Sequence, residues 1–159
     1  MQYWLFKSEP DSYSFQRLAL EGRTEWSGVR NYQARNYMKS MQVGDLGFFY
    51  HSNTSPPGII GICRVIRTAY PDFTALDPQS PYFDPRASAA KPIWEMVDVA
   101  FERPLERFLP LELLRAHQPL AAMALVQKGQ RLSVQPVAAK EWQAILALAL
   151  QPDAVADPE

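Results

Sequence analysis

Apolar and polar residues alternate with a period of two in several short runs along the chain, which is typical of half-buried β-strands. The first run is QYWLFK at residues 2–7, in which successive aromatic, aliphatic and polar residues point to opposite faces. Four later runs are rich in the β-branched and aromatic residues that strands favour, and they cover residues 43–52, 58–70, 93–104 and 131–137. The pattern predicts a protein built on at least five strands.

A helical period replaces the alternation in other segments. Ser14 is a suitable N-cap for a short helix that ends near Gly22, and Asn31 is a suitable N-cap for a second helix. The second helix has an apolar stripe formed by Ala34, Met38 and Met41. Three more helical segments are predicted at residues 111–117, 120–126 and 138–150, the last with Trp142, Ile145, Leu146 and Ala149 facing inward.

Two segments show neither period and are predicted to be loops. Residues 23–30 lead into the second helix, and residues 71–92 contain five prolines, which exclude long regular structure. No repeat, low-complexity block or linker divides the chain. Residues 1–151 are therefore predicted to form one domain, followed by a flexible C-terminal tail at residues 152–159.

Short strands that are apolar on both sides and alternate with short helices favour an α+β fold. We expect a small mixed β-barrel of five or six strands flanked by short helices, because closure removes the exposed edges of such strands. An open α+β sheet of four or five strands is the alternative.

The composition restricts the class of protein. No apolar run approaches the length that crosses a bilayer, so no membrane partner is expected. Cys63 has no second cysteine with which to form a disulfide, which predicts a reducing, cytoplasmic location. Two histidines and one cysteine are too few for a zinc cage of the usual kind, and no nucleotide-cofactor motif is present. Neither a metal nor a cofactor is expected.

The charges are unevenly distributed along the chain. A net charge of −1 argues against indiscriminate binding to nucleic acid. Residues 26–44 and 46–71 nevertheless contain arginine and lysine but no acid, whereas residues 72–112 contain eight acids and four bases. One basic and one acidic face would result if the acid-free segments met in space, and chance variation along short elements is the alternative.

The segment from Trp26 to Asn31 combines features suited to a planar, phosphorylated group. Trp26 could stack on a base, and Gly28 would let a ligand approach the backbone. Arg30 and the helix that begins after Asn31 would favour an anion such as phosphate. The alternative is that Trp26 fills the core and Arg30 is a surface charge.

Polar residues also gather where strands are predicted to end. His51, Ser52 and Asn53 follow one strand, and Gln135 could both donate to and accept from a base edge. Lys7 and Glu9 flank Ser8, where they could form an acid–base pair or an ordinary ion pair. A Ser–His–acid triad using His51 or His117 is not favoured by the residues around them.

Five stretches of the sequence, in this order and at these separations, resemble the EVE domain of the thymocyte nuclear protein family. They are YWLFKSEP, WSGVRNYQARNYM, GDLGFFYHSN, GIIGICRVIRTAYPD and RLSVQPV, and the resemblance runs from Tyr3 to about Leu150. It implies a PUA-like fold and a nucleic-acid-binding module that takes a single modified base into a pocket after base flipping. The implied ligand is 5-methylcytosine or an oxidised form in DNA, or a modified base in RNA.

The resemblance also implies site residues, without a catalytic residue among them. The pocket would be lined by Lys7, Ser8, Glu9, Trp26, Val29, Arg30, Asn31, Tyr50, His51, Ser52, Asn53, Ser133 and Gln135. The phosphate backbone of the bound nucleic acid would contact Arg30, Arg35, Lys39 and Arg131. Eukaryotic members carry a basic N-terminal extension, whereas this sequence starts at its first strand, so a bacterial protein acting in the cytoplasm as a monomer is expected.

Two other functions are compatible with the same residues. ASCH-type proteins of similar fold include amidohydrolases that act on acylated cytidine, and Lys7 with Glu9 could imitate their lysine and carboxylate. The threonine–lysine motif of those enzymes is not matched here, so a non-catalytic reader is favoured. A module whose aromatic loop holds a partner peptide is the remaining alternative.

Overall fold

The computed structural model of the protein describes residues 1–151, and the predicted tail at residues 152–159 lies outside them. The strands are β1 (Tyr3–Ser8), β2 (Arg23–Trp26), β3 (Leu46–His51), β4 (Gly58–Pro71), β5 (Glu95–Pro110) and β6 (Val134–Val137). The α-helices are α1 (Phe15–Glu21), α2 (Tyr32–Ser40), α3 (Leu111–Ala116) and α4 (Ala139–Leu150). Short 3₁₀ turns form η1 (Phe73–Leu76), η2 (Gln118–Leu120) and η3 (Ala124–Val126).

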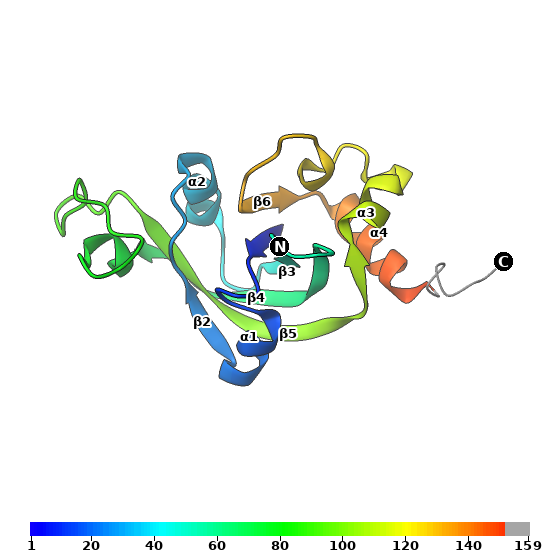
Figure 1. Cartoon of the computed structure of the whole chain (residues 1–159), viewed down its shortest axis with the longest axis horizontal. Helices are drawn as coiled ribbons and strands as arrows, with labels where there is room; N and C mark the ends of the chain where they lie inside the picture. Colours follow the sequence, from blue (N-terminus) through cyan, green and yellow to red (C-terminus); the bar gives the residue numbers. More distant parts are fainter. Residues whose placement is uncertain (152–159) are drawn as a thin grey trace.

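All six strands belong to one mixed sheet with the order β2-β5-β4-β3-β1-β6. β1 runs parallel to β3, and the other neighbouring pairs are antiparallel. The long strands β4 and β5 curve around the molecule, and Figure 1 shows β5 passing beneath the centre before it rises toward α3. Register shifts between β4 and β5 accompany this bend, as expected of β-bulges. The predicted α+β class and the strand number are confirmed.

The barrel is closed by side chains. No ladder joins β2 to β6 within residues 1–151, so these two strands are the edges of the sheet. One hydrophobic cluster nevertheless contains Trp26 from β2, Val134 from β6, and Ala34 and Met38 from α2. Helix α2 contacts β6 at one edge of the sheet and β5 beside the other edge, so it bridges the open side of the barrel.

A second hydrophobic cluster covers the opposite face of the sheet. It packs Leu5 and Phe48 against α3, α4 and the 3₁₀ turns η2 and η3. The indole of Trp142 stacks between strand residues, with ring centroids 4.4 Å from Tyr3 and 3.9 Å from Phe48. In α4 the fourth buried position is Leu148 rather than the predicted Leu146, which is only partly buried.

The two predicted N-caps are confirmed, but one strand was not predicted. The helical segment predicted at residues 120–126 consists instead of the end of η2 and the separate turn η3. Ser14 accepts from the Arg17 amide at 3.0 Å, and Asn31 accepts from the Ala34 amide at 2.9 Å. Residues 23–26, predicted to be loop, form the edge strand β2 against β5. A four-residue segment with three polar side chains carries no apolar alternation, so only the pairing with β5 defines it as a strand.

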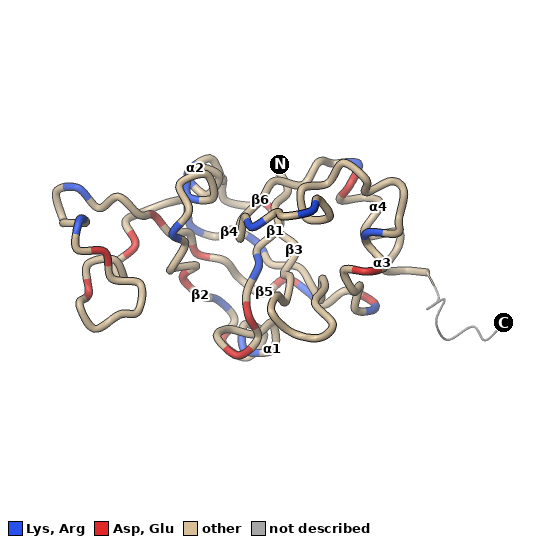
Figure 2. Tube along the Cα trace, turned by 45° about the horizontal axis from the view of Figure 1, so that its top comes forward, with Lys and Arg blue, Asp and Glu red and all other residues tan. Residues whose placement is uncertain are grey.

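The predicted separation into a basic and an acidic face is wrong. Figure 2 shows Lys and Arg interspersed with Asp and Glu along the molecule. The acid-free segments pair with the acidic one, since Arg30 bonds Asp72 at 3.0 Å and Arg64 bonds Glu102 at 2.5 Å. Among the described helices, none is long and apolar enough to cross a membrane.

Candidate functional site

Three of the predicted site segments meet at one end of the sheet. Because β1 and β3 are parallel, their carboxyl ends lie together, with Lys7 opposite Tyr50 and Ser8 opposite His51. The Ser52 amide donates to the Ser8 carbonyl at 2.9 Å, and the Lys7 amide donates to the Ser133 carbonyl at 2.8 Å. Residues far apart in the sequence are thus adjacent at this strand end.

The side chains of these segments divide between the two faces of the sheet, so one pocket cannot be lined by all thirteen as expected. Ser8 and His51 lie on the face of the first cluster, where Ser8 donates to the Tyr13 carbonyl at 2.6 Å. Lys7 lies on the other face, with Nζ 5.8 Å from the centroid of the Tyr50 ring. Gln135 pairs with Leu5 in register and shares that second face. Successive residues of a strand necessarily point to opposite sides.

Trp26 does not present the open stacking face that the sequence suggested. Its side chain is 8% exposed and belongs to the first cluster together with Val29. Phe6, Phe49 and Tyr13 meet it edge-on, with centroids at 5.1, 5.5 and 6.5 Å. The alternative reading, a tryptophan that fills the core, describes its packing. A contact between Trp26 and a base stays a prediction.

Arg30 is likewise not a free guanidinium. It bonds Asp72 at 3.0 Å, Thr74 Oγ1 at 3.2 Å and the Tyr82 carbonyl at 2.7 and 3.1 Å. Only 22% of its side chain is exposed. The donors expected to contact phosphate therefore tie the Trp26–Asn31 segment to the loop that follows β4.

Asp72 is the centre of this connection, and no pattern in the sequence singled it out. Its carboxylate is fully buried and accepts from the Gly28 amide at 2.8 Å as well as from Arg30. It also accepts from the amide and hydroxyl of Thr74 at 2.8 and 2.6 Å. At Gly28, with φ of 84°, a Cβ would come within 2.9 Å of the Tyr82 ring, so only glycine fits against the loop.

The other predicted phosphate contacts differ in whether their side chains already have a partner within the protein. Arg35 donates to the Ile93 carbonyl at 2.9 Å and to the Asn36 side chain. Lys39 and Arg131 are exposed, and within residues 1–151 neither side chain has a hydrogen bond or ion pair. Lys39 and Arg131 are thus available to an anionic ligand, and their contact with one stays a prediction.

The lysine and carboxylate required for the amidohydrolase alternative are not joined. Lys7 is half-buried, and burial lowers its pKa below the ordinary range. Glu9 is exposed, and no ion pair links it to Lys7 in the part of the chain described. No group of three His, Cys, Asp or Glu residues among residues 1–151 is placed to hold a metal.

Gln135 carries an unsatisfied polar atom. Its side chain is fully buried, and its Nε2 donates to the Leu132 carbonyl at 3.0 Å. No partner for Oε1 lies among the described residues. A buried acceptor without a donor costs about 1–3 kcal/mol, so Gln135 retains a hydrogen-bonding capacity that the fold does not use.

His51 is held in its neutral form. Its Nε2 accepts from the Phe15 amide at 3.1 Å, and the side chain is 8% exposed. Burial lowers the pKa of His51 below its ordinary value of 6.5. A proton on Nε2 would remove the acceptor and place a charge in the core.

We therefore expect His51 to make the protein less stable in mild acid. Because its pKa is lower in the folded state, its contribution is complete above pH 6.5 and is lost as the pH falls below that value. The loss is at most about 1.4 kcal/mol per pH unit. Urea denaturation between pH 7.5 and 5 measures it. His51→Gln, which keeps an acceptor, should flatten the dependence. An unaltered profile in His51→Gln would contradict this.

The chain is similar over nearly its whole length to proteins of one family. The family model described as EVE domain matches residues 2–148. Thymocyte nuclear protein 1 of Mus musculus is 43% identical over 165 aligned residues, covering 92% of this chain and 73% of that protein. The same family was expected from the five sequence stretches.

Solved structures agree with this similarity. A crystal structure of a Pseudomonas syringae protein has a TM-score of 0.91 at 51% identity, covering 93% of this chain and 99% of that one. A crystal structure of human THYN1 protein in complex with 5-methylcytosine containing DNA has a TM-score of 0.92 at 40% identity, covering 96% and 99%. An ASCH protein from Zymomonas mobilis has a TM-score of 0.52 at 10% identity, a likeness of fold alone.

Proposed function

Since the chain belongs to the EVE domain family, we propose that it binds nucleic acid and recognises a single modified base of the 5-methylcytosine type. The observation that carries this proposal is the human THYN1 protein in complex with 5-methylcytosine containing DNA. That protein shares the PUA-like α+β fold over 96% of this chain. DNA is the ligand that this comparison supports, and RNA binding stays a prediction.

The polar strand end suits a base that has left its stack. Ser8 and Ser52 are half-exposed there, and Asn53 is exposed. Asn31, at the start of α2, is exposed as well. Asn31 uses Oδ1 to cap α2, which leaves the two protons of Nδ2 to donate to a ligand. Extruding a base costs a few kcal/mol, so single-stranded or damaged sites are the favoured substrates.

The gain from one methyl group sets the size of the selectivity. Burying a methyl contributes about 0.8 kcal/mol, which is about fourfold in affinity. A hydroxymethyl or formyl group can add a hydrogen bond to this. We therefore expect a modest preference for 5-methylcytosine over cytosine.

Fluorescence anisotropy with single-stranded oligonucleotides that differ in one cytosine methyl tests this function. The methylated strand should bind about fourfold more tightly than the plain strand. Asn31→Asp keeps the cap on the Ala34 amide but replaces the donating Nδ2 by a carboxylate oxygen, so it should weaken binding without destabilising α2. Gln143→Glu makes the same charge change on an exposed position of α4 and is the matched control.

Equal binding of strands carrying cytosine, 5-methylcytosine and 5-hydroxymethylcytosine would overturn the proposal. RNA strands of the same sequences, assayed in parallel, decide between the two nucleic acids. If the protein binds the base and catalyses no reaction, every oligonucleotide should be chemically unchanged after incubation. The cytoplasmic location and the monomeric state expected from the sequence stay predictions.

A further inference from the structure

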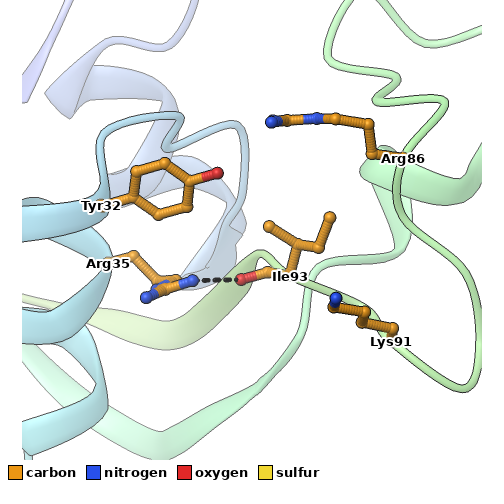
Figure 3. A pocket seen from close by; sticks show the side chains of 5 residues that line it. All are labelled: Tyr32, Arg35, Arg86, Lys91 and Ile93. Atoms are coloured by element: carbon orange, nitrogen blue, oxygen red, sulfur yellow. Dashed lines mark hydrogen bonds between the residues drawn. The ribbon is translucent and has the colours of Figure 1, made fainter.

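A cationic hollow lies beside the start of α2, immediately after Asn31 in the sequence. It has a volume of about 370 Å³ and lies between the start of α2 and the loop before β5. Its lining is Tyr32, Arg35, Arg86, Lys91 and Ile93, and none of these is an acid. Figure 3 shows the three charged groups directed toward the space around Ile93, with the Tyr32 hydroxyl on the side of Arg86.

The wall of the hollow is fixed by contacts outside it. Tyr32 stacks on Trp94 with centroids 4.8 Å apart and an interplanar angle of 20°. The Trp94 Nε1 donates to Asp84 at 2.8 Å, and Arg86 donates to the same carboxylate at 2.8 and 3.1 Å. The aromatic wall and one guanidinium are therefore held in place before any ligand arrives, which lowers the entropic cost of binding.

A second guanidinium is held by the backbone. Arg35 donates to the Ile93 carbonyl at 2.9 Å, and its guanidinium carbon lies 4.9 Å from the Tyr32 ring centroid. Ile93 has a φ of 64°, a left-handed conformation that is rare for a β-branched residue. This backbone conformation accompanies the bond to Arg35, so the position of the cation is set by the fold.

The hollow keeps a positive charge even after its internal pairing is considered. The negative charge of Asp84 neutralises Arg86. Hydrogen bonds from Arg86 and Trp94 hold the pKa of Asp84 well below its usual range, so Asp84 stays ionised. Lys91 is exposed, and within residues 1–151 its side chain has no ion pair. Arg35 is also not paired with a described acid. Two positive charges remain for a ligand.

We propose that this hollow binds a backbone phosphate of the strand whose base occupies the candidate site. The inference rests on the proposed function, because the phosphate belongs to the same ligand. Tyr32 directly follows Asn31, and two residues of chain span at most about 7 Å, so the hollow begins within reach of a nucleotide held at Asn31. Arginine forks and a lysine are the groups that bind phosphate oxygens in proteins.

Such a contact positions the strand and reads no sequence. Modified and plain strands should therefore depend on it equally. Of its lining residues, only Arg35 was among the predicted phosphate contacts. Arg86 and Lys91 lie in the proline-rich loop, whose place beside α2 follows from the Asp72 connection and not from any local pattern.

Lys91→Gln tests the hollow, because it removes a charge without removing a described contact of the side chain. Binding of a single-stranded oligonucleotide with one 5-methylcytosine is measured by anisotropy from 50 to 200 mM salt. One lost phosphate contact lowers the slope of log K against log salt by about 0.7–0.9, so the affinity of the unaltered protein should fall about threefold more than that of the variant. Lys140→Gln, an exposed lysine on α4, is the control and should keep the full slope.

Failure of the hollow and failure of the proposed function give different results. If Lys91→Gln keeps the full slope while methyl selectivity persists, the hollow does not bind phosphate. If methyl selectivity is absent but Lys91→Gln lowers the salt slope, the hollow binds phosphate and the proposed recognition of a modified base is wrong. An unaltered protein that binds neither strand at 50 mM salt overturns both. Binding of inorganic phosphate alone as tightly as the strand would assign the hollow to free phosphate instead.

Discussion

Replacing Trp26 with alanine should lower the free energy of unfolding by about 3–5 kcal/mol, the usual cost of removing a large aromatic side chain from a core. The indole is 8% exposed and contacts three aromatic rings from β1, β3 and the segment before α1. Its loss would leave a cavity among Phe6, Tyr13 and Phe49. Chemical denaturation followed by tyrosine fluorescence or circular dichroism measures the change.

Trp26→Phe is the matched control for Trp26→Ala. It keeps an aromatic ring among Phe6, Tyr13 and Phe49 and should cost much less than alanine. Binding assays belong with the phenylalanine variant, since loss of methyl selectivity in a partly unfolded alanine variant would say nothing about stacking. A destabilisation below about 1 kcal/mol in Trp26→Ala would contradict the core role and would restore the interpretation as a stacking platform.

Replacing Asp72 with alanine should cost about 3 kcal/mol and should free the loop of residues 73–92. The change removes the acceptor for Gly28, Thr74 and Arg30 and leaves the Arg30 charge, 22% exposed, without its carboxylate. Breaking a buried pair in this way costs about 3–5 kcal/mol, and the partial exposure of Arg30 places the expected value at the low end. Denaturation gives the total cost, and limited proteolysis reports whether cleavage within the loop becomes faster.

Asp77→Ala in the same loop is the comparison for Asp72→Ala. Asp77 is exposed and caps only the Gln79 amide at 2.9 Å, so its loss should cost under about 1 kcal/mol and leave proteolysis nearly unchanged. Equal stabilities for the two variants would show that Asp72 does not hold the loop. Because the loop carries Arg86 and Lys91, Asp72→Ala should also weaken strand binding, with a smaller salt slope.

Local chemistry was sufficient to predict most elements of this fold. The caps at Ser14 and Asn31 and the apolar stripe of α2 depend on neighbouring residues only, and the structure confirms all of them. The edge strand β2 depends on β5, about seventy residues later, and its own sequence RTEW is too short and too polar to show a clear apolar alternation. Elements defined by a distant partner are the ones that sequence pattern alone misses.

In the candidate site, too, the features that the sequence did not predict are those that depend on a distant segment. The meeting of Ser8 with His51 follows from the parallel pairing of β1 with β3, which no local pattern predicted. The states of Trp26 and Arg30 depend on which other segments pack on them. Phe6, Tyr13 and Phe49 surround Trp26. The proline-rich loop covers Arg30 through Asp72 and Tyr82. A flat or multi-donor side chain has the same sequence signature whether it meets a ligand or another part of its own chain.

The line between β2 and β6 gives the molecule a place where it can open. Separating these strands disturbs the contacts of Trp26, Val134 and Met38, but it breaks no interstrand hydrogen bond. Every other boundary between neighbouring strands would have to lose a ladder. Widening of the sheet is therefore least costly along this line, where no ladder has to be broken.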